Sequence, residues 1–561
     1  MNPFLRRGRE ENAFFAFVAN LRLFLQRYSR VPIGLAYGVT VVAFLWICAQ
    51  FYLPGQGFTY LIIFGERENP RYIPALRALN HYELEGSPGY DAQYYAQIAM
   101  QPRLSDPALK QGVDNLAYRA RRILFCWTAY GLALGSPARA MHIYAVQNIV
   151  CWLLLAGLLL RWFPTTNWGN FFRWFCVLFS FGLCFSVRGS LVDGPSLLLI
   201  AIALALAESG RPWWSAMVLG VSGLGKETNL LAGAALARPA ANTWRAWLAV
   251  LGRGLIIVLP LVLWLGVLWR WLGEIGDAGL RNFAAPFVAG AAKWRETLVQ
   301  LMADSSDPFA RMSGYMLVAL TVQFLFFLLR PRWRDAWWRV AAAYSVLMIF
   351  LGEAVWEGYP GAASRVLLPM TLAFNILVPR GWKWWLMLLL GNLTILGSYD
   401  PLRPPPRESY SVEGPRTLRM AVDSGRTVTA VFNDKWYPAE RSRLEYWRWS
   451  KGSATVTLRN PQPFAILATV SFSLRCNDDR KVGLWQDDYA RWERTLKRGE
   501  LKVIKVRNMR LKAGDTLWKF ETDVPAIYPG NNDPRRLAFR LSDLNIDILG
   551  RADDLPPKKA K

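Results

Sequence analysis

An apolar run of membrane-spanning length occupies residues 246–271 and reads AWLAVLGRGLIIVLPLVLWLGVLWRW. Because an α-helix rises about 1.5 Å per residue, this run is long enough to cross the hydrocarbon core of a bilayer, which is about 30 Å thick. The sequence therefore predicts a polytopic α-helical membrane protein. Further runs of this kind lie on both sides, at residues 32–53, 141–161, 170–187, 313–330 and 383–398.

Shorter apolar segments fill the spaces between these runs and read as helices buried within a bundle. Together with the six long runs, they predict about eleven transmembrane helices between residues 32 and 398. Residues 122–135 leave the count open by about two, because this segment could be re-entrant, interfacial or a true span. The shorter segments are 196–208, 213–224, 227–238, 337–352 and 365–379.

The formal charge of +25 would indicate nucleic acid as a partner of a soluble protein. Here the basic residues gather in the N-terminal segment 1–31 and in the short loops 238–245, 330–339 and 380–383. Short basic loops stay on the cytoplasmic side, so we expect no nucleic acid and a cytoplasmic N-terminus. With eleven crossings the C-terminal domain is extracytoplasmic. No small-residue cleavage pattern precedes the first run, which predicts an uncleaved anchor.

Cysteine and histidine limit the chemistry that the chain can perform. Five of the six cysteines lie in or near apolar segments and read as small core residues, and Cys476 alone follows them, so no disulfide is expected within the C-terminal domain. With two histidines and no CxxC or HExxH, a zinc or haem site is not expected. Residues 221–228 lack the first glycine of a phosphate-binding loop, so ATP-driven pumping is not expected either.

A proline-rich linker at residues 399–410 separates the apolar part from a region of alternating polar and apolar residues. The alternation predicts an antiparallel β-sandwich over residues 411–551, followed by a disordered basic tail at 552–561. Tryptophans at 436, 447 and 449 could cradle a glycan, although packing in the core is the favoured interpretation. The expected strands are 427–432, 454–458, 464–474, 502–511, 516–520 and 537–541.

One carboxylate stands among aromatic rings and amides in the stretch GYDAQYYAQIA at residues 89–99. It is Asp91, in a predicted external loop at 54–121. The predicted topology puts several further ionisable residues at the same membrane face, and such residues are functional candidates by default. Cations beside carboxylates are what an anionic lipid headgroup requires. The residues at this face include Arg119, Arg122, Arg188, Asp193, Lys226, Glu227, Glu357, Tyr359 and Arg365.

Each of these residues also has a purely structural interpretation. Asp91 could be a solvated loop residue or a helix cap, and Asp193, before Gly-Pro-Ser and an apolar run, has an N-cap signature. Lys226 and the adjacent Glu227 could form an ion pair at a helix break. The arginines at 119, 121, 122 and 365 could extend toward phospholipid headgroups.

The stretch from Tyr90 to Ala99 resembles an element that follows the first helix of bacterial GT-C fold glycosyltransferases. The element has an aromatic residue, Asp, a small residue, any residue, an aromatic residue and Tyr, with Ala92 standing here where glycine is commoner. Three further stretches are similar to elements of the same group, and they occur in the same order. They are Ala117-Tyr118-Arg119-Ala120-Arg121-Arg122-Ile123-Leu124, Lys226-Glu227-Thr228 and Ser364-Arg365-Val366-Leu367-Leu368-Pro369.

The resemblance implies an integral membrane enzyme that takes a sugar from a polyprenyl-phosphate donor and passes it to a glycan or glycolipid acceptor. Asp91 matches the general base, and the absence of a paired nucleophile favours inversion. No DxD motif is present, so we expect no metal, or at most a loosely bound divalent cation. Arg119, Arg122, Lys226, Arg365 and Arg188 are the candidates to stabilise the leaving phosphate. The candidate sugar contacts are Tyr90, Gln93, Tyr94, Tyr95, Asp193, Glu227, Glu357 and Tyr359.

The C-terminal sandwich resembles the carbohydrate-binding domains appended to some membrane glycosyltransferases, which implies that it holds the acceptor or closes over the active site. Two other classes of function stay open. A non-enzymatic transporter of lipid-linked sugar would share the basic face, but it needs a polar path through both leaflets. A GT-C-like assembly protein without activity would bind a partner through the sandwich.

Overall fold

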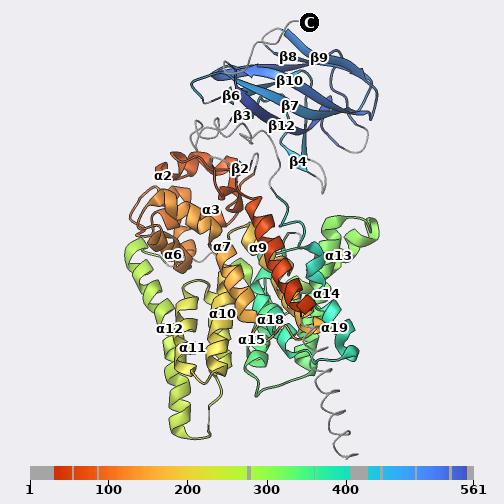
Figure 1. Cartoon of the computed structure of the whole chain (residues 1–561). Helices are drawn as coiled ribbons and strands as arrows, with labels where there is room; N and C mark the ends of the chain where they lie inside the picture. Colours follow the sequence, from red (N-terminus) through yellow and green to blue (C-terminus); the bar gives the residue numbers. More distant parts are fainter. Residues whose placement is uncertain are drawn as a thin grey trace, which may run out of the picture. The chain divides into compact units, whose positions relative to one another are not determined.

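The computed structural model describes residues 31–53, 56–84, 87–239, 241–274, 280–358, 360–404, 428–441, 446–460, 462–486, 489–529 and 533–552. Residues 1–30 of the predicted cytoplasmic segment 1–31, residues 405–410 of the linker and nearly all of the tail lie outside these residues. The chain forms two compact units (Figure 1). The first, a helical unit, contains Met1–Ala49 and Tyr94–Arg403, and the second contains Gln50–Gln93 and Pro404–Lys561. Residues 50–93, which include the first part of the predicted external loop, thus group with the C-terminal strands.

Four helices among the described residues are long and apolar enough to cross a membrane, and they match predicted runs. A fifth span is formed if α8 (Trp168–Leu178) and α9 (Phe181–Arg188), which are bent by 46° at their break, count as one. These apolar helices indicate a membrane protein. The expected number of eleven crossings stays a prediction. The four helices are Val31–Ala49, α7 (Pro137–Leu159), α12 (Trp244–Leu272) and α14 (Pro308–Leu329).

The shorter apolar segments form helices as expected, but two predicted segments differ. The run 383–398 is broken into the 3₁₀ turns η5 (Trp382–Trp384) and η6 (Leu393–Gly397) around α19 (Trp385–Leu390), with Gly391 and Asn392 at the second break. Residues 227–236 form a 3₁₀ helix, η3, instead of an α-helix. The others are α10 (Asp193–Glu208), α11 (Pro212–Gly223), α15 (Ala336–Phe350), α17 (Ala363–Val366) and α18 (Leu368–Leu377).

The ambiguous segment 122–135 contains α6, Leu124–Leu132, which is too short to span a bilayer by itself. The region before it is also helical. Its elements are α3 (Ala92–Met100), α4 (Leu109–Gly112) and α5 (Leu116–Ala120). Further elements of the helical unit are η4 (Leu280–Asn282), α13 (Val288–Ala303) and α16 (Glu353–Trp356).

Residues 50–93 contain short elements held together by one buried amide. The Gln93 Oε1 accepts hydrogen bonds from the Tyr72 hydroxyl at 2.8 Å and from the Gly65 N–H at 3.1 Å, and its Nε2 donates to the Pro88 carbonyl at 2.8 Å. The short strands pair in parallel. The elements are η1 (Thr59–Leu61), β1 (Phe64–Gly65), η2 (Glu66–Arg71), α2 (Pro74–Arg77) and β2 (Glu83–Leu84).

The C-terminal domain contains two five-stranded antiparallel sheets, which agrees with the predicted sandwich (Figure 1). Their strand orders are β10-β7-β12-β5-β4 and β3-β6-β11-β8-β9. The sequence missed β4, β5, β8 and β9. In β9 nearly every position is exposed, and in β8 nearly every position is buried, so neither strand shows a clear alternation. The strands are β3 (Thr429–Phe432), β4 (Glu440–Arg441), β5 (Tyr446–Trp449), β6 (Ala454–Asn460), β7 (Ile466–Cys476), β8 (Arg480–Gln486), β9 (Tyr489–Leu496), β10 (Leu501–Leu511), β11 (Gly514–Thr522) and β12 (Phe539–Arg551).

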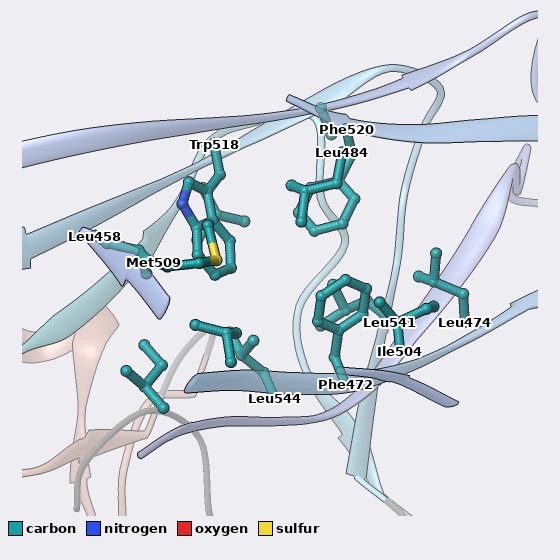
Figure 2. Close-up of a cluster of buried hydrophobic side chains, with 14 of the residues drawn as sticks. Leu458, Phe472, Leu474, Leu484, Ile504, Met509, Trp518, Phe520, Leu541 and Leu544 are labelled. Carbon is teal, nitrogen blue, oxygen red and sulfur yellow. The ribbon is translucent and has the colours of Figure 1, made fainter. Parts of the chain in front are cut away.

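Apolar side chains from the two sheets meet in one core (Figure 2). Phe472 of β7 contacts Phe520 of β11 edge to face, with ring centroids 5.7 Å apart. Trp436 is buried in this core, so the core interpretation is confirmed for that tryptophan. Trp447 and Trp449 are only half-buried, and the Arg540 guanidinium lies 4.9 Å from the Trp447 ring centroid.

Candidate functional site

A buried carboxylate, Asp193, lies at the centre of the ionisable residues in the helical unit. It is the first residue of α10 and is only 5% exposed. Its Oδ1 accepts a hydrogen bond from the Lys226 Nζ at 2.5 Å, and its Oδ2 accepts one from the Arg365 Nη1 at 3.0 Å. The N-cap interpretation of Asp193 is therefore wrong, because the carboxylate faces two cations instead of the backbone N–H groups of its own helix.

Two closely packed glycines, one against backbone and one against an aromatic ring, lie beside these cations. Arg365 lies on α17, and a Cβ on Gly182 of α9 would stand only 2.2 Å from the Ser364 carbonyl oxygen. Lys226 precedes η3, and a Cβ on Gly225 would stand 2.7 Å from the Phe125 ring. Glycine is thus required on both sides of the site for steric reasons.

A second ion pair joins Arg122 to Glu227. The Arg122 Nε donates to the Glu227 Oε2 at 2.9 Å, and its Nη1 and Nη2 donate to the hydroxyls of Tyr95 and Tyr118 at 3.2 and 3.1 Å. Burial by itself would lower the pKa of Arg122, but the charge of Glu227 and these partners hold that pKa well above its ordinary value. The predicted pairing of Lys226 with Glu227 is wrong, since each has a different partner.

Arg119 lies near the same tyrosines and has a different carboxylate partner. Its Nε and Nη2 donate to the two carboxylate oxygens of Asp114 at 3.0 and 2.7 Å. Its guanidinium carbon lies 5.1 Å from the ring centroid of Tyr94, 5.6 Å from that of Tyr95 and 5.5 Å from that of Tyr118. Arg119 and Arg122 are therefore held by carboxylates and tyrosines, and both guanidinium groups lie near the Tyr118 ring.

We call Arg122, Asp193, Lys226, Glu227 and Arg365 the charge cluster. Its members interact electrostatically across the two ion pairs, since Arg122 acts on both Asp193 and Lys226. Three cations face two carboxylates, so the cluster has one net positive charge in a largely buried place. Such an arrangement attracts an anionic group.

The remaining predicted residues lie elsewhere or contact other groups. Asp91 and Tyr90 belong to the second unit, with Asp91 half-buried directly before α3. Gln93 uses its amide to hold residues 65–88, as described above. In the helical unit, Arg188 is buried at the end of α9. Glu357 is exposed, with an oxygen 3.8 Å from the Arg281 Nη2. Tyr359 lies outside the described residues.

The structure adds residues that the sequence did not nominate. The ring of Tyr118 lies near both Arg119 and Arg122, and its hydroxyl also accepts a hydrogen bond from the Asn282 Nδ2 at 3.4 Å. Tyr344 is buried and donates to the Thr228 carbonyl at 2.9 Å, one residue beyond Glu227. Tyr118 stands inside the quoted Ala-Tyr-Arg stretch and could have been found there. No pattern in the sequence distinguishes Tyr344 from other tyrosines.

Comparison with known proteins gives distant likenesses only. No family model and no curated protein matches the chain. The arabinosyltransferase EmbB from Mycobacterium smegmatis is 10% identical over 91% of this chain, with a TM-score of 0.25, and this chain spans 64% of its length. TmCBM61, solved in complex with β-1,4-galactotriose, is 16% identical over 25% of this chain and 99% of its own, with a TM-score of 0.15. We therefore draw the function below from the charged residues.

Proposed function

We propose that the chain is a membrane glycosyltransferase that transfers a sugar from a polyprenyl-phosphate donor to an extracytoplasmic glycan or glycolipid. The observation that carries this proposal is the charge cluster in the helical unit. A polyprenyl-phosphate donor is an anion attached to an apolar chain. The combination of apolar helices with a buried, net positive cluster fits both of its parts.

The carboxylates of the cluster also support this assignment. Without these carboxylates the cations would repel one another and would bind any anion tightly. With Asp193 between Lys226 and Arg365, the cations stay in place when no substrate is bound, and one net charge is left for the donor phosphate. As the glycosidic bond breaks, negative charge grows on the leaving phosphate, and cations already in position stabilise that charge without rearranging.

Asp91 is the proposed general base. It matches the acid of the GT-C-like element that runs from Tyr90 to Ala99. A sugar hydroxyl is a weak acid, so the base takes its proton as the oxygen attacks the anomeric carbon and the phosphate leaves. One base without a second nucleophile gives a single displacement, which inverts the configuration of the sugar. No step requires a metal ion.

Substitution of Asp91 by Asn tests the role of this carboxylate. The change keeps the size of the side chain and removes the base, so we expect sugar transfer to fall by about 10²–10⁴-fold while donor binding is retained. Transfer is measured by mass spectrometry of envelope glycans and with purified protein in liposomes. Glu66→Gln, which neutralises an exposed carboxylate in the same unit, serves as the control.

Unchanged transfer by the Asp91→Asn variant at normal expression would exclude Asp91 as the base. The same liposomes distinguish an enzyme from a transporter of lipid-linked sugar. An enzyme makes a glycosylated product on the side where the acceptor is supplied. A transporter moves the donor between leaflets and makes no product, and that result would contradict the proposal.

A further inference from the structure

A second basic site lies in the helical unit, apart from the charge cluster. A cavity of about 280 Å³ is lined by the start of α8 and by the segment that contains η5 and α19. Its lining includes Arg173 and Arg380, and none of the residues that line it is acidic. The proposed reaction makes no use of this place.

The two arginines are not neutralised by the part of the chain that the structure describes. Arg173 is 5% exposed, and its Nη1 and Nη2 donate to the carbonyls of Asn375 at 2.6 Å and Pro379 at 3.1 Å. A guanidinium has five N–H groups. The two hydrogen bonds to these carbonyls fix the orientation of the Arg173 side chain and leave further N–H groups as donors for a ligand. Arg380 is exposed and close enough for its charge to repel that of Arg173. Two cations kept together in this way favour an anion between them.

Asn170 adds an acceptor to the same cavity. This side chain is 1% exposed, and its Nδ2 donates to the Pro164 carbonyl at 2.9 Å and to the Thr166 Oγ1 at 3.0 Å. The Pro164 carbonyl can only accept, which fixes the orientation of the amide. The Oδ1 is then buried without a donor among the described residues. Since an unsatisfied buried acceptor is costly, a ligand with a hydroxyl would stabilise this position.

The surroundings of the cavity are apolar and lie at a predicted membrane interface. Trp384, Trp385 and Leu388 line it, and the Arg330 guanidinium lies 4.6 Å from the Trp384 ring centroid. Next to them, Trp382 and Leu386 are 78% and 68% exposed. Tryptophan and arginine together are typical of the headgroup region of a bilayer. This composition favours a lipid over a soluble anion.

We infer that this cavity binds the phosphate headgroup of an anionic membrane lipid that carries a hydroxyl group. The phosphate oxygens accept hydrogen bonds from Arg173 and Arg380, the hydroxyl donates to the Asn170 Oδ1, and the tryptophans pack against the glycerol and upper acyl chains. The charge pattern of the loops predicts that this lipid belongs to the cytoplasmic leaflet.

Lipid binding to the purified full-length protein tests the inference. Native mass spectrometry measures the affinities for phosphatidylglycerol and for phosphatidylcholine with the same acyl chains. We expect Arg380→Gln to weaken phosphatidylglycerol binding about tenfold, as expected for loss of a charged hydrogen bond. Lys383→Gln removes an equal charge from an exposed neighbour that does not line the cavity, so it should change the affinity less than about twofold. Equal thermal stability of the two variants confirms that both are folded.

Three results would overturn the inference. Equal weakening by Lys383→Gln would show that only the general surface charge attracts the lipid. Equal affinity of the wild type for phosphatidylcholine would show that the protein recognises neither the net negative charge of the headgroup nor its hydroxyl. Inorganic phosphate that binds in an Arg380-dependent way, while phosphatidylglycerol does not, would identify the ligand as a soluble phosphate compound.

Discussion

Replacement of Asp193 by Asn tests whether the charge cluster is held together by its central carboxylate. The amide has the same shape, so no cavity forms, but Lys226 and Arg365 lose the charge of a carboxylate that contacts them at 2.5 and 3.0 Å. The side chains of all three residues are less than one-tenth exposed. Water therefore cannot replace the lost charge.

The expected magnitude follows from this burial. Removing one partner of a buried ion pair costs about 3–5 kcal/mol, because the remaining charge is left without compensation. We expect the apparent Tm of the purified protein to fall by on the order of 10 °C. The exposed Glu357, whose oxygen is 3.8 Å from Arg281, gives a matched control, since Glu357→Gln should change stability by no more than about 0.5 kcal/mol.

A double variant distinguishes the effect of the lost charge on stability from the effect of the changed side-chain shape. Adding Lys226→Met to Asp193→Asn returns the cluster to its original net charge. We expect the double variant to be more stable than the sum of the single effects by about 1–3 kcal/mol. The measurement is thermal unfolding of the detergent-solubilised protein followed by intrinsic fluorescence. A stability of Asp193→Asn equal to that of the wild type, or strictly additive effects, would refute the electrostatic explanation.

Three further predictions concern single positions. Burial raises the pKa of Cys476 to about 12, so alkylation mapped by mass spectrometry should spare this thiol at pH 9 until the domain unfolds. The thiol of the unfolded chain ionises near pH 8.5, so raising the pH above that value should also lower the stability of the native domain. Unfolding midpoints measured at several pH values would show this loss. Gly225→Ala forces a methyl group toward Phe125 and should lower the Tm, whereas alanine at Gly254, which has no neighbour within 4 Å, should leave it unchanged or raise it. Glu208→Gln weakens acceptors for Arg161, Trp162 and Trp337, and we expect a loss of about 1 kcal/mol in the same thermal assay.

Much of the architecture follows from local patterns in the sequence. The length of an apolar run decides whether a helix can cross a bilayer, so the long helices at 137–159, 244–272 and 308–329 were predictable. Alternation decides which face of a strand is buried, and it predicted β6, β7 and β11. Where these patterns weaken, prediction failed: the glycine and asparagine at 391–392 break an apolar run, and the polar strand β9 shows no clear alternation.

Which residues form ion pairs with one another in the charge cluster depended on the tertiary structure. The sequence nominated Asp193, Lys226, Glu227 and Arg365 from helix ends and resemblance, and the one ion pair that it offered as an alternative joined Lys226 to its neighbour Glu227. Packing instead joins Asp193 to Lys226, 33 positions away, and to Arg365, 172 positions away. The partners of a buried ion pair are decided by which segments pack closely, and Gly182 against the Ser364 backbone and Gly225 against the Phe125 ring allow that packing. The sequence by itself therefore determined that charged residues gather among apolar helices. Only the tertiary structure decided which carboxylate pairs with which cation, because a buried charge without a partner is strongly destabilising.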